Sequence, residues 1–135
     1  PGMSFEIINP DALGRPSGWN HGLLAPAHGR VLFVAGQTAA DASGAVPPAN
    51  FVQQWDRVLA RVVAVVRAAG GAPEDIGRIT VYVTDRAAYL ASRPSLGEIH
   101  RRHLGRHYPA MALVAVQALV DANALVEMEA TAVLP

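Results

Sequence analysis

The chain has 135 residues, 51% of them hydrophobic and 16% charged; its 11 arginines balance 11 acidic side chains, and it has no cysteine. These numbers favour a single domain over residues 1–135 and exclude disulfides, thiolate nucleophiles and sulfur-based zinc sites. Because it has no apolar run of about 18 to 20 residues, no secretion signal and no basic cluster, we expect a cytoplasmic protein without membrane or nucleic-acid partners. Pro1 and Gly2, which precede Met3, resemble the remnant of an expression tag.

The first part of the chain is predicted to be extended. Residues 5–9 are a predicted short strand, and residues 22–38 read as a hairpin whose tight turn lies at His28 and Gly29. Residues 41–50 contain one glycine and two prolines, so they are predicted to form a connecting loop.

A long amphipathic helix is predicted to follow, with Asn50 as its N-cap and Gly70 and Gly71 at its end. Apolar side chains recur at three-and-four spacing from Phe51 to Ala69, which is typical of one buried helical face. The opposite face is predicted to meet water and carries Gln53, Gln54, Arg57, Arg61 and Arg67.

The remaining elements complete an alternating pattern. Residues 78–84 alternate as a strand does, and Asp85 is the predicted cap of a second helix that Pro94 must kink or split. Strands are then predicted at 112–119 and 125–134. The order β, β, β, α, β, α, β, β favours an α+β domain with two helices on one face of a mixed sheet.

Several strings in the chain resemble the Rid family, also called YjgF and by an older name the L-PSP endoribonuclease family. They are VLFVAGQTAAD followed by SGAV, then AGGAPEDIGRITVYVTD, HYPAMALVAVQAL and ALVEMEATAVLP. Several strings in the correct order arise by chance far less often than one short motif.

The resemblance implies a chorismate-mutase-like subunit, three of which join their sheets into a homotrimeric barrel with a small-molecule cleft at each subunit boundary. A small, nearly neutral and half-hydrophobic chain also favours a homo-oligomer in its own right. In the best-studied branch of the family, the cleft hydrolyses enamine and imine metabolites to 2-keto acids and ammonia without a metal or cofactor. An arginine in a Pro-Ala-Arg string pairs with the substrate carboxylate, and the first glutamate of a Glu-x-Glu pair positions water.

This sequence keeps the glutamate and lacks the arginine. Glu127 matches the catalytic, water-positioning carboxylate, whereas Met111 stands in the arginine's place. A thioether offers neither charge nor donor to a carboxylate, so deamination of 2-imino acids is not expected unless another arginine takes over. Met111 could line a cleft reshaped for a less acidic ligand or simply fill a vestigial one. Glu127 and Glu129 share a strand face and could serve acid and base chemistry or be structural.

Other candidate substrate-binding residues lie in the first third of the chain. Trp19 and His21 occupy the place where family members carry a cleft-lining string, and Trp19 could stack on a flat ligand or plug an interface. His21 could exchange a proton near pH 7. Ala35 replaces a serine of the best-studied branch, whereas Gly36 and Gln37 match the family string, and Gly36 lets the backbone approach a ligand.

A histidine series offers a possible metal site. His100, His103 and His107 are spaced by three and four residues, but Gly105 interrupts the series and a polar helix end is the better interpretation. The family resemblance also implies that no cofactor is needed, so neither a metal nor a cofactor is expected.

Three functions remain open from the sequence. The first is an imine or enamine hydrolase that uses Glu127, the second a metabolite-binding or regulatory module without turnover, and the third a ribonuclease, which the neutral charge and dispersed arginines do not favour.

Overall fold

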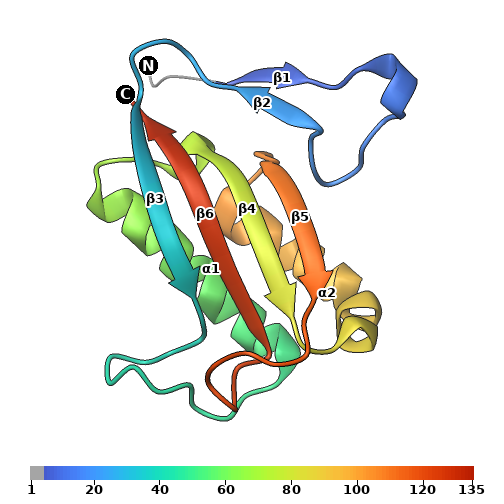
Figure 1. Cartoon of the computed structure of the whole chain (residues 1–135), viewed down its shortest axis with the longest axis vertical. Helices are drawn as coiled ribbons and strands as arrows, with labels where there is room; N and C mark the ends of the chain where they lie inside the picture. Colours follow the sequence, from blue (N-terminus) through green and yellow to red (C-terminus); the bar gives the residue numbers. More distant parts are fainter. Residues whose placement is uncertain (1–4) are drawn as a thin grey trace.

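The computed structural model describes residues 5–135, so the prediction for Pro1 and Gly2 lies outside the described residues. Six strands and two α-helices follow one another in the predicted order (Figure 1). They are β1 (Glu6–Ile8), β2 (Gly22–Leu24), β3 (Arg30–Gln37), α1 (Phe51–Ala68), β4 (Ile76–Val83), α2 (Arg86–Leu104), β5 (Ala110–Ala115) and β6 (Val126–Leu134). Short 3₁₀ turns at Asp11–Leu13 and Pro73–Asp75 precede β2 and β4.

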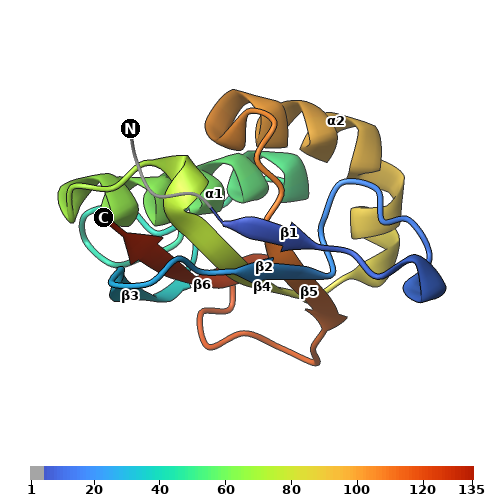
Figure 2. The ribbon, with the colours of Figure 1, turned by 90° about the horizontal axis from the view of Figure 1, so that it is seen from above.

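The main sheet has four strands in the order β3-β6-β4-β5. β4 and β5 are parallel and the other two pairs are antiparallel, which makes the sheet mixed as predicted. Both helices pack on one face of this sheet, and Figure 2 shows them as a separate layer above the strands. Among residues 5–135, no helix lies on the opposite face of the main sheet (Figure 2).

The predicted hairpin over residues 22–38 is wrong. β2 pairs with β1 in a separate two-stranded sheet, whereas β3 pairs with β6 at the other end of the chain. A chain turn does occur at His28, which has a positive φ of 67°. β3 pairs with β6 because their two alternating apolar faces match over most of their length, whereas three-residue β2 offers little to pair with.

The last two strands of the chain, β5 and β6, do not pair with each other either. β5 follows α2 in a β-α-β crossover, which places it parallel to β4, and β4 separates it from β6. α2 is one helix rather than two, with Pro94 inside it. Its ends are those predicted: the Asp85 side chain accepts a hydrogen bond from the Ala88 amide, and Gly105 follows the helix with a positive φ of 61°.

The first helix is confirmed with one correction. Asn50 and Gln53 form a capping box, and the buried face runs from Phe51 to Val66. Gln54, predicted to meet water, is only 1% exposed. It lies at the border of the buried face, and residues 123–125 cover it and use its amide group. Within residues 5–135, no helix combines the length and apolar character that crossing a bilayer requires.

Candidate functional site

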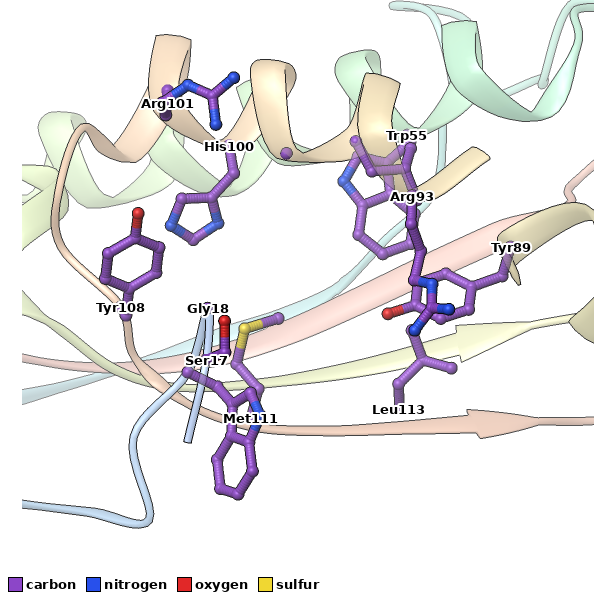
Figure 3. Close-up of a pocket in the computed structure, with 13 residues that line it drawn as sticks. Ser17, Gly18, Trp55, Tyr89, Arg93, His100, Arg101, Tyr108, Met111 and Leu113 are labelled. Atoms are coloured by element: carbon purple, nitrogen blue, oxygen red, sulfur yellow. The ribbon is translucent and has the colours of Figure 1, made fainter. Parts of the chain in front are cut away.

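A pocket of about 670 Å³ opens between α2, the start of β5 and the loop before β2 (Figure 3). On β5, Met111 pairs with Ile79 and Leu113 pairs with Val81, two residues of β4 that are buried under the helices. Because side chains alternate between the two faces of a strand, Met111 and Leu113 point toward the helices and form the floor of this pocket. Its lining residues are Ser17, Gly18, Trp19, Trp55, Tyr89, Arg93, Leu96, Gly97, His100, Arg101, Tyr108, Met111 and Leu113.

Asn20 fixes the loop that carries Trp19 at the edge of β5. Its side-chain amide donates to the Tyr108 carbonyl at 2.7 Å, and its oxygen accepts from the Asn9 amide at 2.8 Å. An isolated bridge joins Asn20 to Ala110. The indole of Trp19 is thereby held next to Met111 as one wall of the pocket.

Helix α2 supplies the opposite wall. The His100 ring stacks on Tyr108 with centroids 4.8 Å apart and planes 11° from parallel. Its Nε2 lies 2.8 Å from the carbonyl oxygen of His107, a geometry in which the nitrogen donates. Burial of the ring lowers the pKa of His100, so the imidazole is neutral at pH 7. Tyr89 packs beside Trp55 with centroids 5.8 Å apart.

The sequence did not predict this helical wall. Tyr89, Arg93, Gly97 and Arg101 follow one another at intervals of four, which places them on one face of α2. That spacing was available in the sequence, but it does not show which element the face meets. The two guanidinium groups of Arg93 and Arg101 thus border the same pocket as Met111.

Glu127 lies on the other face of the sheet. On β6 it lies between the buried residues Val126 and Met128 and pairs with Tyr82 of β4, so its side chain points away from the helices. Its carboxylate packs against Gly36 so closely that a Cβ at that position would overlap it. A larger residue at position 36 would therefore displace the Glu127 carboxylate from this place, a steric role that differs from the predicted approach of a ligand.

The two carboxylates of β6 have different surroundings. The Tyr82 hydroxyl donates to Glu129 Oε1 at 2.8 Å, and this bond is the main reason why the pKa of Tyr82 is raised. Within residues 5–135, no comparable donor reaches the half-buried Glu127 carboxylate.

The other predicted residues lie around these two centres. Ala35 and Gly36 form a bulge between Val34 and Gln37, where β3 holds one residue more than β6. Gln37 turns to the helix side, where its oxygen accepts from Arg61 Nε at 3.1 Å. His21 meets the Trp19 indole edge-on at 4.6 Å but does not line the pocket.

A single chain therefore separates the predicted site into two parts. Trp19 and Met111 share the pocket on the helix side, and Gly36 and Glu127 meet on the open face. A cleft lined by both Met111 and Glu127 has to be built from two copies of the chain.

The three histidines of the possible metal site point to different partners. His103 contacts Asp56 at 2.6 Å, and His107 Nε2 lies 2.6 Å from the carbonyl oxygen of Ile76. His100 bonds the His107 carbonyl. Within the described part of the chain, no three such side chains gather as metal ligands would.

Known proteins share this sequence and fold. Residues 11–134 match the family model described as Endoribonuclease L-PSP. YyfB of Yersinia pestis, a protein of the conserved Rid family, is 34% identical, and its structure matches with a TM-score of 0.84 over 98% of this chain and 100% of that chain. This chain belongs to the Rid family.

Two further relatives extend the comparison. A RutC family protein of Pyrococcus abyssi (strain GE5 / Orsay) is 31% identical to this Rid-family protein, covering 96% of this chain and 98% of the relative. E. coli TdcF, solved with bound serine, is 28% identical with a TM-score of 0.64, covering 95% of this chain and 98% of that chain. The predicted family and its fold, two helices on one face of a mixed sheet, are confirmed.

Proposed function

We propose that this Rid-family protein hydrolyses a reactive imine, enamine or related metabolite, with Glu127 activating the attacking water. One observation carries the proposal. The Glu127 carboxylate is half-buried against Gly36 and has no donor of its own among residues 5–135, whereas Glu129 is engaged by Tyr82. Of the two carboxylates on this face, Glu127 is thus the one free to hold a water molecule.

The chemistry needs one base that later returns its proton. Glu127 takes a proton from water as the water oxygen bonds to the imine carbon, and the C=N electron pair moves to nitrogen. The proton then passes to that nitrogen, which gives a carbinolamine. Glu127 next takes the proton of the carbinolamine hydroxyl and delivers it to the nitrogen, the C–N bond breaks as the C=O bond forms, and ammonia leaves. An enamine enters the same sequence after protonation at carbon.

The proposed assembly is a homotrimer with a cleft at each subunit boundary. The separation of Met111 and Glu127 onto opposite faces supports such a shared cleft, since two copies are needed to combine them. The serine bound to TdcF supports a small molecule as the ligand. Met111 supplies no charge at the position of the family arginine, so a small 2-imino acid that depends on that pairing should be a poor substrate.

A second candidate is a metabolite-binding module without turnover. It is favoured by the composition of the Met111 pocket, whose lining includes no carboxylate. A ligand that binds tightly and is recovered unchanged from the intact oligomer would support this candidate. Endoribonuclease activity, which the family description names, gains no support from arginines that are dispersed along a neutral chain.

The hydrolase proposal is tested by ammonia release from imines that an amine oxidase generates in the assay. Glu127→Gln keeps the shape of the side chain but removes the base, so we expect a rate loss of about 100-fold or more. Glu129→Gln is the matched control, because it lies on the same strand and face, and it should stay within about threefold of the wild type.

The proposal fails if Glu127→Gln and the wild type release ammonia equally fast. Circular dichroism melting of both variants shows whether a lost activity reflects lost folding. An equal loss in both variants would also count against a specific role for Glu127.

A further inference from the structure

The Met111 pocket is positively charged and has aromatic walls. Arg93 and Arg101 border it, together with two tryptophans and two tyrosines, and its lining contains no acidic side chain. Within residues 5–135, the salt bridges to arginine and histidine involve Arg102 and His103 with Asp56, so Arg93 is not held by a carboxylate of its own chain.

The Arg93 side chain enters the pocket. Figure 3 shows it extending from α2 toward Tyr89 and Leu113, whereas the Arg101 side chain lies along the helix, with Nη1 close to Gly97. Arg93 is exposed to solvent, and its guanidinium borders the same aromatic and apolar lining to which Met111 belongs. A guanidinium in such surroundings can pair with a carboxylate through two parallel hydrogen bonds.

Gly97 leaves room for a flat ring between the polar groups of the helix. It lies four residues after Arg93 and three before His100, and a Cβ at this position would meet only Arg101 Nη1, at 3.7 Å. Arg93 and His100 are seven residues apart on one face, which corresponds to about 10 Å along the helix axis. Gly97 puts no side chain on the helix surface between them, and Arg101 Nη1 lies at its edge, so a ring or a conjugated chain that reaches from Arg93 to His100 would pass over this glycine.

His100 provides an acceptor at the other end of this space. Its Nε2 donates to the His107 carbonyl, so in the neutral ring Nδ1 carries no proton and can accept a hydrogen bond. The ring is kept neutral by its burial, which lowers the pKa of His100. The pocket thus combines a cation at one end with a neutral acceptor at the other.

We infer that this pocket binds a planar, conjugated carboxylate with an N–H or O–H donor at its far end, and that Arg93 is the residue that selects the carboxylate. Met111 offers no cation to the ligand carboxylate. In this proposal Arg93 on α2 supplies the cation instead, at a position that a larger ligand can reach. The inference rests on the proposed function in that it takes this pocket as the substrate side of the shared cleft. It does not depend on turnover.

The test measures binding rather than activity. Both tryptophans of the chain line the pocket, so the two indole N–H resonances in a ¹H–¹⁵N NMR spectrum report ligand entry directly. The probes are 4-aminobenzoate and its uncharged isostere 4-aminobenzamide, with pyruvate as a small carboxylate and calorimetry for the affinities. We expect 4-aminobenzoate to bind about tenfold more tightly than the amide, and pyruvate not to shift either resonance.

Arg93→Ala should remove the preference for 4-aminobenzoate over 4-aminobenzamide while leaving the amide affinity almost unchanged. Arg86→Ala is the matched control, because it removes an exposed guanidinium from the same helix outside the pocket lining, and it should keep the preference. The lysine variant Arg93→Lys should retain only part of it, since an ammonium lacks the planar two-point geometry. Unchanged preference in Arg93→Ala, equal loss in both alanine variants, or no indole shift with 4-aminobenzoate would each overturn the inference.

The binding test and the hydrolase test fail independently. Glu127→Gln should bind 4-aminobenzoate as the wild type does, because Glu127 is not in the lining of this pocket. Selective carboxylate binding without any ammonia release would retain this inference and refute the proposed hydrolysis. Hydrolysis of uncharged imines, together with a pocket that shows no preference for a carboxylate, would support the proposed hydrolysis and refute this inference.

Discussion

His100 illustrates how one side chain links the pocket to folding stability. Its ring is half-buried between Tyr108 and the helix, with Nε2 bound to the His107 carbonyl. The nearby basic side chains are those of Arg101 and His107, while Arg93 borders the same pocket further along the helix. Burial, together with these charges, disfavours the protonated ring and lowers the pKa of His100 below its unfolded value of about 6.5.

We therefore expect mild acidification to lower the free energy of unfolding because of His100. Below about pH 6.5 the unfolded chain binds a proton at His100 that the folded chain resists, so the free energy of unfolding decreases until the folded pKa is passed. His100→Gln keeps an amide donor for the His107 carbonyl but does not titrate. Urea unfolding at pH 7.5 and 5.5 should show a smaller pH effect in this variant than in the wild type.

An equal pH effect in wild type and His100→Gln would contradict this account.

Asp56 affects the stability in a different pH range. Its hydrogen bond from His103, opposed by burial and helped by Arg102, lowers the pKa of its carboxyl, so the stability it contributes is lost only in more acidic solution.

The family strings predict candidate site residues by their position in the sequence. Glu127, Gly36 and Met111 are predicted in this way, and the structure adds that Glu127 and Gly36 touch. Arg93 is not predicted from the sequence, because the role we propose for it depends on which strand its helix face covers, and that is decided by packing between distant segments. A single-sequence pattern contains the spacing of such residues but not the partner of the face.

Among the elements, α1 shows how a polar residue ties a helix to a distant loop. The Gln54 amide nitrogen donates to the carbonyls of Ala49 and Asn123, at 3.1 and 2.9 Å, and its oxygen accepts from the Leu125 amide at 2.9 Å. The side chain is almost fully buried. Gln54 thus pairs with a backbone group just before α1 and with two backbone groups just before β6.

Gln54→Leu should destabilise the fold by about 2 to 4 kcal/mol, because it leaves buried carbonyl and amide groups without partners. Arg57→Ala, a substitution on the exposed face of the same helix, should stay within about 0.5 kcal/mol of the wild type. Urea denaturation followed by circular dichroism measures both. Similar midpoints for the two variants would show that water replaces the Gln54 bonds.

The helices were easier to predict from the sequence than the strand pairing. The capped start of α1 and the ends of α2 are set by local residues, Asn50 with Gln53, and Asp85 with Gly105. The partner of β3 is β6, about a hundred residues away, and no local signal distinguishes it from the neighbouring β2. Gln54 was misplaced for the same reason, since the loop that covers it comes from the far end of the chain.

At the scale of the whole molecule, the helices of residues 5–135 cover one face of the main sheet and leave the other without a helix. Phe33 is 80% exposed and Val31 55% exposed on β3, on the face opposite the helices, and Val114 of β5 is also exposed. An apolar sheet face of this kind is usually buried in an assembly. The Glu127 carboxylate shares this face, so closing it between copies would bring the carboxylate to a subunit boundary.

We therefore expect the protein to be a homotrimer that joins through this face. Phe33→Asp places a charge at the centre of the apolar area and should convert the trimer to monomers in sedimentation equilibrium. Leu90→Asp is the control, because Leu90 is 47% exposed on α2, in the helix layer, and this variant should stay trimeric. The monomeric Phe33→Asp variant should lose hydrolysis but still bind 4-aminobenzoate, since the Arg93 pocket is complete within one chain and the cleft that includes Glu127 is not. A wild-type monomer, or a Phe33→Asp trimer, would contradict both the assembly and the division of the site between copies.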